Sequence, residues 1–380
     1  METLCALIRG DLAPAGNKIS LASDPAAFAY PVVGYNSTWL DSGTSALALA
    51  IADARQKAPH IKNPNVIIPG YCCPDLVAAA VYAGVRPLAV DIGEADAGYD
   101  LEALKAAINE ETLAVIAVNF LGIKERLAEI RALLANTTIK LIEDNAQWFP
   151  ASATEHDFLS DYIVFTFGRG KPLSLLGGGV LFSRENLAVA DLIQPARDDS
   201  AQDLKQYGKL RAYNLLLNPH CYCYLNRAPF LQLGQTQYHR LTEIRGLDSY
   251  RKALFAPNLL LHRQRDKGLE RAYDAICTAA GAQQLLSINT ERRKRLLRYP
   301  LLCAESSRRD FLLREFNAAG LGASPMYPCC IAEIPGVSQL LDVAGDLKHA
   351  RHFAACFLTL PTHEYVSDKH IQRIKKILAR

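Results

Sequence analysis

The sequence lacks the features that mark secreted, membrane-spanning or nucleic-acid-binding proteins. Its ten cysteines include no C-x-x-C pair, and doublets such as Cys72-Cys73 and Cys329-Cys330 suit neither a zinc site nor a disulfide framework in a chain of 380 residues. No run of about 20 apolar residues is present, and Met1–Arg9 lacks a basic segment followed by a long apolar one. A formal charge of only +3 excludes a strong electrostatic attraction to nucleic acid or anionic membranes.

These absences predict a cytoplasmic protein with reduced thiols, no metal and a small-molecule partner. Aromatic residues make up only 8% of the chain, but 50% is hydrophobic and 21% is charged. This balance excludes disorder, collagen and coiled coil, and 380 residues suffice for a large domain and a smaller one.

Between residues 40 and 185 the sequence alternates short β-branched runs with segments that carry Ala and Leu at helical spacing. This alternation predicts parallel strands joined by crossover helices, hence a three-layer α/β domain. The predicted strands are Val66–Ile68, Pro87–Asp91, Leu113–Val118, Lys140–Glu143, Tyr162–Thr166 and Gly179–Phe182. The predicted helices between them are Ser45–Arg55, Pro74–Ala83, Leu101–Ile108 and Glu125–Ala135.

Beyond about residue 190 the pattern becomes irregular and aromatic. Helical character returns over Leu259–Ala280 and Arg308–Ala319, an extended segment is predicted at Ala323–Tyr327, and Ser367-Asp368 provides the N-cap of a last helix. We therefore predict a large domain over residues 1–240 and a smaller α+β domain over residues 241–380.

Ligands of parallel sheets bind beyond the carboxyl ends of the strands, so polar residues at those points are candidate site residues. Asp41–Leu47 is a small-residue turn that opens a helix, and it suits either a phosphate group or a plain N-cap. Asp144 lies at the mouth of an apolar strand. Its carboxylate either holds a positive charge on a ligand, such as a protonated ring nitrogen, or caps the next helix.

Two further segments follow predicted strands. Lys171 lies in a glycine-rich turn that is not a nucleotide-binding P-loop, because Pro172 stands where that motif requires Ser or Thr. A lysine there is either a Schiff-base amine or an ordinary solvated loop lysine. Tyr71, in the turn Pro69–Asp75, offers either a stacking surface for a flat ring or a packing group.

Taken in chain order, these segments resemble fold-type I pyridoxal-phosphate enzymes, and specifically the DegT/DnrJ/StrS aminotransferases, best known as sugar aminotransferases. The matching stretches are Ser42–Leu47, Val66–Tyr71, Ala83–Asp91, Ile142–Gln147, Phe165–Lys171, Gly322–Tyr327 and Leu358–His363. The resemblance implies a three-layer transferase fold of type I, in which a mostly parallel sheet forms the large domain and a smaller α+β domain follows.

The resemblance also implies roles for single residues toward the cofactor, pyridoxal 5'-phosphate. Lys171 would carry it as a Schiff base, Asp144 would pair with its pyridinium nitrogen, and Gln147 would contact the 3′-oxygen of its ring. Its phosphate would be cradled by Gly43, Thr44, Ser45 and Thr166. Relatives often carry the ring-stacking aromatic at the position of Cys73, so the aromatic side chain left for this role is Tyr71.

In function, the resemblance implies an aminotransferase that moves an amino group from L-glutamate to a keto-sugar or nucleotide-sugar in a ping-pong cycle, as in cell-surface polysaccharide biosynthesis. It implies a homodimer with a shared active site, to which Asn214 or Arg211 of the partner would contribute. Alternatives are a pyridoxal-phosphate lyase, desulfurase or condensing enzyme, and a non-catalytic binding or regulatory protein on the same fold. The basic run Arg292–Arg295 is either a site for an acidic ligand or a solvated face.

Overall fold

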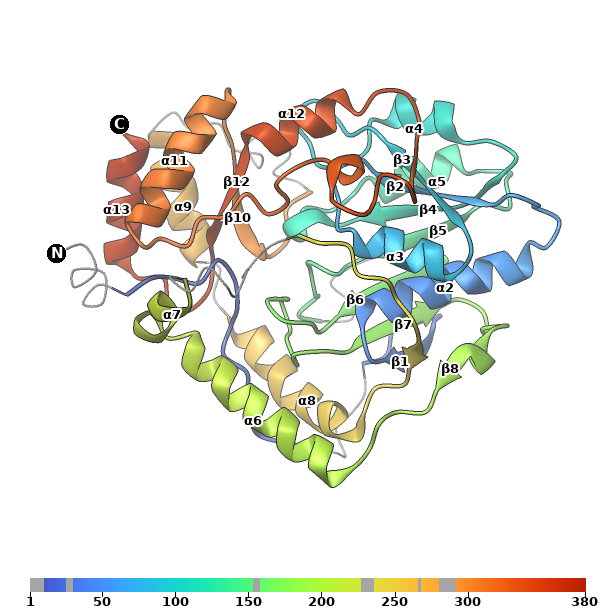
Figure 1. The fold of residues 1–380 in the computed structure, drawn as a ribbon, viewed down its shortest axis with the longest axis horizontal. Coiled ribbons are helices and arrows are strands. Elements are labelled where there is room, and N and C mark those ends of the chain that lie inside the picture. The colour runs from blue at the N-terminus through green and yellow to red at the C-terminus, as the bar shows by residue number, and fades with distance from the viewer. Residues whose placement is uncertain (1–9, 25–29, 153–157, 227–235, 266–267, 280–291) are drawn as a thin grey trace.

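The computed structural model describes residues 10–24, 30–152, 158–226, 236–265, 268–279 and 292–380. Its centre is an eight-stranded sheet with the order β1-β7-β6-β5-β4-β2-β3-β11 (Figure 1). The strands are β1 Asn36–Leu40, β2 Asn65–Pro69, β3 Arg86–Val90, β4 Thr112–Val118, β5 Lys140–Asp144, β6 Tyr162–Thr166, β7 Gly179–Ser183 and β11 Asp342–Val343. Residues Met1–Arg9, which we predict to hold no targeting segment, lie outside the described residues.

The six predicted strands are confirmed as β2 to β7, but the sheet is not parallel throughout. Strands β2 to β6 and β11 run parallel, whereas β7 is antiparallel to both β6 and β1. The reason is the connection between β6 and β7, which has no crossover helix and reverses the chain in a glycine-rich turn. Strand β1 was not predicted, because its mixed polar sequence has no clear alternation.

Helices cover both faces of this sheet. They are α2 Gly43–Lys57, α3 Asp75–Tyr82, α4 Leu101–Ala107 and α5 Leu127–Leu133. Because side chains alternate along a strand, Val66 and Ile68 of β2 pack in one apolar cluster with α2 and α3, whereas Ile67 packs in another with α4 and α5. Figure 1 shows these helix pairs on opposite sides of the sheet. The predicted three-layer architecture is thereby confirmed.

The rest of the chain is more helical than predicted. It contains α6 Ser200–Leu216, α7 Pro219–Asn226, α8 Ser249–Gln264, α9 Gly268–Ala279, α11 Ser306–Ala318, α12 Lys348–Cys356 and α13 Asp368–Leu378. Its strands are β10 Arg298–Leu302 and β12 Phe357–Pro361, which pair antiparallel, and the short parallel pair β8 Ile193–Gln194 and β9 Ile244–Arg245.

Three predictions for this part of the chain need correction, and two are confirmed, one of which is the helix over Arg308–Ala319, observed as α11. The region after residue 190, predicted to be irregular, forms α6 and α7, and the single helical stretch predicted over Leu259–Ala280 is divided between α8 and α9. The extended segment Ala323–Tyr327 makes one isolated bridge, from Ser324 to Thr359. The last helix does begin after its predicted cap, Ser367. The domain boundary near residue 240 stays a prediction, and Phe255 of α8 packs with Phe165 and Phe167 from the β6 end of the sheet.

The segment Arg292–Leu297 joins the C-terminal part of the chain to the loop after β4. Backbone N–H groups of Lys124, Lys294 and Leu297 donate to Arg292, Gly122 and Leu121 at 2.8, 2.8 and 3.0 Å. Through these bonds the segment Arg292–Leu297 runs along the loop that follows β4. The loop itself carries Phe120 and Leu121, which are almost fully buried.

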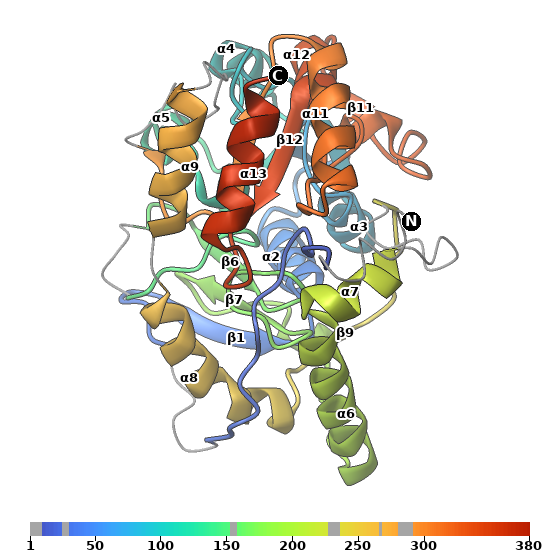
Figure 2. The ribbon, with the colours of Figure 1, turned by 90° about the vertical axis from the view of Figure 1, so that its left-hand side faces the viewer.

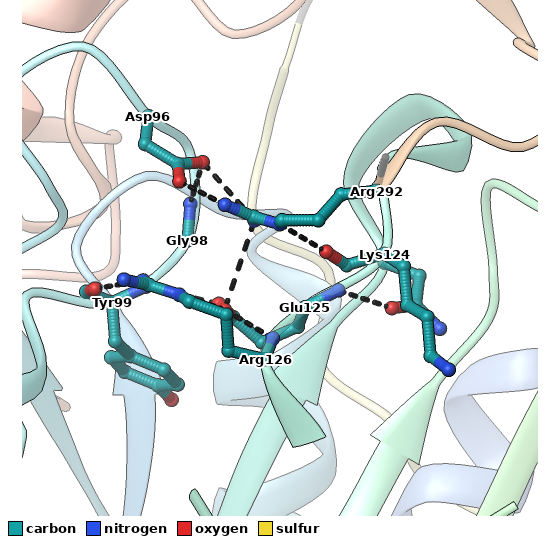
Figure 3. A network of polar contacts seen from close by, with 8 residues as sticks. Asp96, Gly98, Tyr99, Lys124, Glu125, Arg126 and Arg292 are labelled. Carbon is teal, nitrogen blue, oxygen red and sulfur yellow. Dashed lines mark hydrogen bonds and ion pairs between the residues drawn. The ribbon is translucent and has the colours of Figure 1, made fainter. Parts of the chain in front are cut away.

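Side chains strengthen this joint, as Figure 3 shows. The guanidinium of Arg292 pairs with Asp96 and donates to the carbonyl of Lys124 at 2.7 Å. Glu125 is buried, accepts the N–H of Tyr99 at 3.0 Å and lies 3.9 Å from Arg292. Burial raises the pKa of the Glu125 carboxyl, an effect that the neighbouring Arg126 and Arg292 oppose.

Of the two predictions for the basic run Arg292–Arg295, the solvated face is wrong. Arg293 pairs with Glu270 and Asp274 of α9 at 3.0 and 2.6 Å, and Arg295 donates to the carbonyls of His262 and Arg265 at the end of α8. The run is thus half-buried and tied into the fold, and is not a solvated face.

No helix among the described residues is long and apolar enough to cross a membrane. Within the same residues, no group of three or more His, Cys, Asp or Glu side chains is placed to hold a metal ion. The nine cysteines in this part of the chain are free thiols.

Gly122 tests the joint between the loop and the C-terminal segment. Its φ of +93° disfavours any other residue, and an added Cβ would collide with the carbonyl oxygen of Arg295. We expect Gly122→Ala to lower the free energy of unfolding by about 3 kcal/mol, as measured by urea denaturation. The matched control is Gly208→Ala, in α6, where an added methyl group meets no atom within 4 Å. That change should stabilise the protein by about 0.5–1 kcal/mol, and equal effects of the two variants would contradict the assignment.

Candidate active site

A cavity opens at the carboxyl ends of β4, β5 and β6, where ligands of parallel sheets bind. The N-termini of α2 and α3 also reach it. Its lining residues are Gly43, Thr44, Leu47, Cys72, Cys73, Asp75, Leu76, Val118, Phe120, Asp144, Ala146, Gln147, Val164, Thr166, Lys171 and Tyr327.

The first wall is the turn from β1 into α2. Ser42 is the N-cap of α2, and its hydroxyl accepts the N–H of Ser45 at 3.0 Å. Gly43 and Thr44 follow as the first residues of α2, and both line the cavity. The first N–H groups of a helix have no partner inside it, so this end of α2 offers backbone donors and the positive end of the helix dipole to an anion.

Two close contacts hold this turn against the turn that carries Lys171. A Cβ added at Gly43 would lie 2.5 Å from Cβ of Thr166, and a Cβ added at Gly179 would lie 2.5 Å from the carbonyl oxygen of Ser42. The N–H of Gly178 donates to the carbonyl of Asp41 at 2.7 Å. Only glycine leaves room for this contact, which brings the start of α2, Thr166 and Lys171 to one cavity.

Asp144 ends β5 as a buried carboxylate. Its Oδ1 accepts the N–H of Ala146 at 2.8 Å, which is the one hydrogen bond of this carboxylate among the described residues. Burial raises the pKa of Asp144 from 3.8 to about 6, and this effect outweighs the Ala146 hydrogen bond and the positive charge of Lys171, which lower it. A carboxylate in this state is stabilised when a cationic group binds in the cavity.

Neutral polar groups fix the end of β5 from the opposite face of the sheet. The neighbouring Glu143 is fully buried and accepts the side-chain amides of Asn119 and Asn145 at 2.9 and 3.1 Å and the hydroxyl of Ser160 at 3.2 Å. The backbone N–H of Asn119 also donates to the carbonyl of Asp144 at 3.0 Å. This network leaves Asp144 little freedom to turn away from the cavity.

Gln147 lines the cavity with its amide held at both ends. Its Oε1 accepts the N–H of Leu121 at 2.8 Å, and its Nε2 donates to the hydroxyl of Tyr327 at 2.9 Å. An amide nitrogen carries two hydrogens, so a second donor is left for a ligand.

The structure brings six of the eight predicted site residues together around the cavity, namely Gly43, Thr44, Asp144, Gln147, Thr166 and Lys171. The other two do not line it. Ser45 is fully buried behind the turn, where its hydroxyl donates to Asp41 at 2.6 Å. Ser45 therefore braces the turn from within.

Tyr71 needs a larger correction. Its ring is 1% exposed and packs edge-on against Phe120, Tyr327 and Phe353, and its hydroxyl donates to the carbonyl of Tyr327 at 3.0 Å. The tyrosine thus belongs to the core between the sheet and the C-terminal part of the chain. Cys73, two residues further along the chain, lines the cavity instead. Burial raises the pKa of its thiol to about 12.

Sequence reasoning missed Phe120, Asp75 and Tyr327 as parts of the cavity. Asp75 and Phe120 follow predicted strands, so the rule that found Asp144 also points to them. Tyr327 lies 180 residues from its partner Gln147, and only the fold brings the two together. Asn214, predicted to reach a partner's site, bonds to the backbone of Ile19 in its own chain at 2.8 and 2.9 Å.

These residues fit pyridoxal phosphate. The cavity offers an amine at Lys171, a buried carboxylate at Asp144 for a ring cation, and a glycine-lined helix end with hydroxyls at Thr44 and Thr166 for a phosphate. The fold has three layers, with helices on both faces of a mostly parallel sheet. A lysine and a carboxylate placed in this way on such a fold define a fold-type I pyridoxal-phosphate enzyme.

Comparison with known proteins specifies the family. The model of the DegT/DnrJ/EryC1/StrS aminotransferase family matches residues 28–227 and 259–379. The chain belongs to this family, and it is a pyridoxal-phosphate-dependent aminotransferase.

The relatives with assigned activities are distant but match most of the chain. UDP-2-acetamido-2-deoxy-3-oxo-D-glucuronate aminotransferase of Pseudomonas aeruginosa is 24% identical over 82% of this chain and 77% of its own length. UDP-N-acetyl-3-dehydro-alpha-D-glucosamine 3-aminotransferase of Acidithiobacillus ferrooxidans is 24% identical over 89% and 82%. The crystal structure of DesI with its TDP-sugar product shares the fold with a TM-score of 0.68, at 16% identity over 98% and 92% of the two chains.

The raised pKa of Asp144 gives the cofactor-free protein a testable pH dependence. A carboxyl whose pKa is higher in the folded than in the unfolded state loses its stabilising contribution as the pH rises through about 6. We expect Asp144→Asn, which keeps the shape and the acceptor for Ala146, to be about 2–3 kcal/mol more stable than the wild type at pH 8.

At pH 4 the two proteins should unfold at nearly the same urea concentration, because the wild-type carboxyl is then largely protonated. Equal stability at pH 8 would show that the site does not disfavour the charged form of Asp144.

Proposed function

We propose that this aminotransferase moves an amino group from L-glutamate to the carbonyl carbon of a nucleotide-linked keto-sugar in a ping-pong cycle. The observation that carries the proposal is the placement of Lys171 and Asp144 on one cavity beside a glycine-lined helix end. Bound pyridoxal phosphate supplies a carbonyl group that condenses with amines and a ring that accepts electron density from the substrate carbon.

Lys171 is the proposed catalytic residue. Its side chain lies in the cavity on a turn fixed by the Gly178 and Gly179 contacts. Its Nζ attaches the cofactor in the resting enzyme and, once an amine substrate replaces it, is the base that carries the proton at the reacting carbon. A base held in one place beside the carbon protonates and deprotonates a single face of it.

Asp144 and the start of α2 hold the two charged ends of the cofactor. Asp144 keeps the ring nitrogen protonated, because a cation beside a buried carboxylate stabilises both charges. Gln147 donates its second N–H to the ring oxygen. At the other end, the N–H groups of Gly43 and Thr44 and the hydroxyls of Thr44 and Thr166 bind the phosphate.

The sugar acceptor is supported by the relatives. Both curated relatives named above are aminotransferases of keto-sugars linked to UDP, and the chain covers more than three quarters of each. Amino-sugars of this kind supply cell-surface polysaccharides, the pathway class that the resemblance implies for this chain.

The two half-reactions test the proposed function separately. Addition of L-glutamate to the holoprotein should convert the visible absorbance band of the bound cofactor to that of its amine form and release 2-oxoglutarate. Addition of a UDP-linked 3-keto-sugar should restore the band and give the amino-sugar, detected by mass spectrometry. A band that glutamate leaves unchanged would favour a lyase or condensing enzyme, and a protein that binds no cofactor would favour the non-catalytic alternative.

Lys171→Ala identifies the attachment residue. The variant should lack the visible band of the covalently bound cofactor and any turnover, while its circular dichroism stays that of the wild type. Arg169→Ala is the matched control, because Arg169 is exposed on the same turn and does not line the cavity. A visible band in Lys171→Ala at wild-type strength would exclude Lys171 from this role.

We also propose a cytoplasmic homodimer that shares its active sites. Figure 2 shows that α6 extends away from the body of the protein. Leu204 and Leu215 of this helix and Tyr224 of α7 are 72%, 63% and 65% exposed, more than a monomer needs to leave in water. Sedimentation equilibrium should give twice the chain mass, and Leu204→Glu with Leu215→Glu should shift the protein toward the monomer. A wild-type monomer at working concentrations would refute the dimer.

A further inference from the structure

A second cavity, of about 490 Å³, lies behind the active site. It touches the two segments that carry the main site residues, because Pro172 follows Lys171 and Phe149 comes two residues after Gln147. Its other walls come from the end of α8, the start of α9 and the last residues of the joint segment Arg292–Leu297. The cavity thus lies between the sheet, α8 and the C-terminal part of the chain.

Two guanidinium groups line this cavity without a carboxylate partner. Arg265 and Arg295 make no ion pair among the described residues, and their hydrogen bonds go to carbonyl oxygens. Arg265 donates to Pro172 at 2.6 Å, and Arg295 donates to Arg265 at 2.9 Å and to His262. The Nε of Arg295 is buried and has no partner in the described part of the chain. Carbonyl oxygens carry only partial charges, so the described part of the chain leaves most of these two positive charges unbalanced.

Two acidic side chains of the described residues lie near these guanidinium groups, and neither forms an ion pair with them. Glu270 lines the cavity, but its carboxylate accepts the guanidinium of Arg293 at 3.0 Å and the N–H of Leu296 at 2.9 Å. The negative charge of Glu364 acts on Arg265 from a distance, and its carboxylate accepts the N–H of Lys18 at 3.3 Å. His262 adds no charge of either sign near neutral pH, since burial lowers its pKa to about 4.

We propose that this cavity is a second ligand site, for the phosphate group of a small molecule or for free phosphate. Two planar guanidinium groups at one cavity match the oxygens of such a dianion, with paired hydrogen bonds and full charge compensation. The apolar side chains of Leu269 and Leu296 also line the cavity and would contact an organic group attached to the phosphate.

The site is coupled to the active site through one hydrogen bond. Arg265 holds the carbonyl of Pro172, the residue next to Lys171, at 2.6 Å. An anion that fixes the guanidinium of Arg265 therefore also fixes one end of the turn that carries Lys171. The bound anion stabilises the protein and reduces the mobility of this turn.

Binding to the holoprotein tests the site, because the cofactor then fills the phosphate cradle at α2. Isothermal titration with inorganic phosphate and with glycerol phosphate, against chloride at equal ionic strength, should give saturable binding of at least one of them, with a rise in melting temperature. Tighter binding of glycerol phosphate identifies a phosphorylated metabolite as the ligand class, and tighter binding of inorganic phosphate identifies the free ion. Binding of neither overturns the proposal, whatever the catalytic activity.

Charge-removing variants locate the binding. Arg265→Gln keeps an N–H donor for the carbonyl of Pro172 but removes the positive charge. Arg295→Gln likewise keeps an N–H donor for the carbonyls of His262 and Arg265 at the end of α8 and removes the charge. Each should weaken phosphate binding by about tenfold or more. Arg263→Gln is the control, because Arg263 is exposed at the same helix end and bonds to Ala151 outside the cavity. Equal binding by all three variants overturns the proposal.

A second measurement covers the case in which these variants do not fold. A crystal structure of the wild-type holoprotein grown in phosphate should show density between the guanidiniums of Arg265 and Arg295. Density confined to the first cavity, with saturable binding at no second site, would overturn the assignment.

Discussion

The contact between two turns is the constraint on which the active site depends. At Gly179 the backbone that enters β7 lies against the backbone that enters α2, and Gly43 lies against the side chain of Thr166, so closely that neither position has space for a Cβ atom. The contact turns the start of a long buried helix, the hydroxyl of Thr166 and the amine of Lys171 toward one point. It also explains why β7 is antiparallel, because the chain reverses in this glycine-rich turn and returns beside β6.

Strand alternation gives two adjacent carboxylates opposite tasks. Glu143 and Asp144 are consecutive in β5, so their side chains leave the sheet on different faces. Glu143 enters a closed network of amides and a hydroxyl, whereas Asp144 enters the cavity with one oxygen bonded to Ala146. The first carboxylate is satisfied by the fold itself, and the second needs a ligand to balance its charge. Two consecutive residues of one strand therefore provide both the support and the binding group.

The sequence allowed the central sheet, its layers and most of the cavity to be predicted, because these depend on local patterns. Apolar runs ended by polar residues located β2 to β6, and the same endings led to Asp144 and Lys171. Contacts between distant segments were beyond this reasoning. Tyr71 follows a strand as a stacking residue would, yet the C-terminal aromatic side chains draw it into the core. Tyr327 enters the wall from the far end of the chain, and the mostly exposed α6 shows little apolar periodicity.

The joint at Arg292–Leu297 has a consequence for how substrates enter. The loop that it grips carries Phe120, part of the cavity wall, and Leu121, whose N–H orients Gln147. Three backbone hydrogen bonds and the ion pair with Asp96 would have to break before the C-terminal part could swing away from this wall. Hinge opening at this joint is therefore disfavoured, so a ligand has to reach the cavity without rotation of the C-terminal part away from this wall.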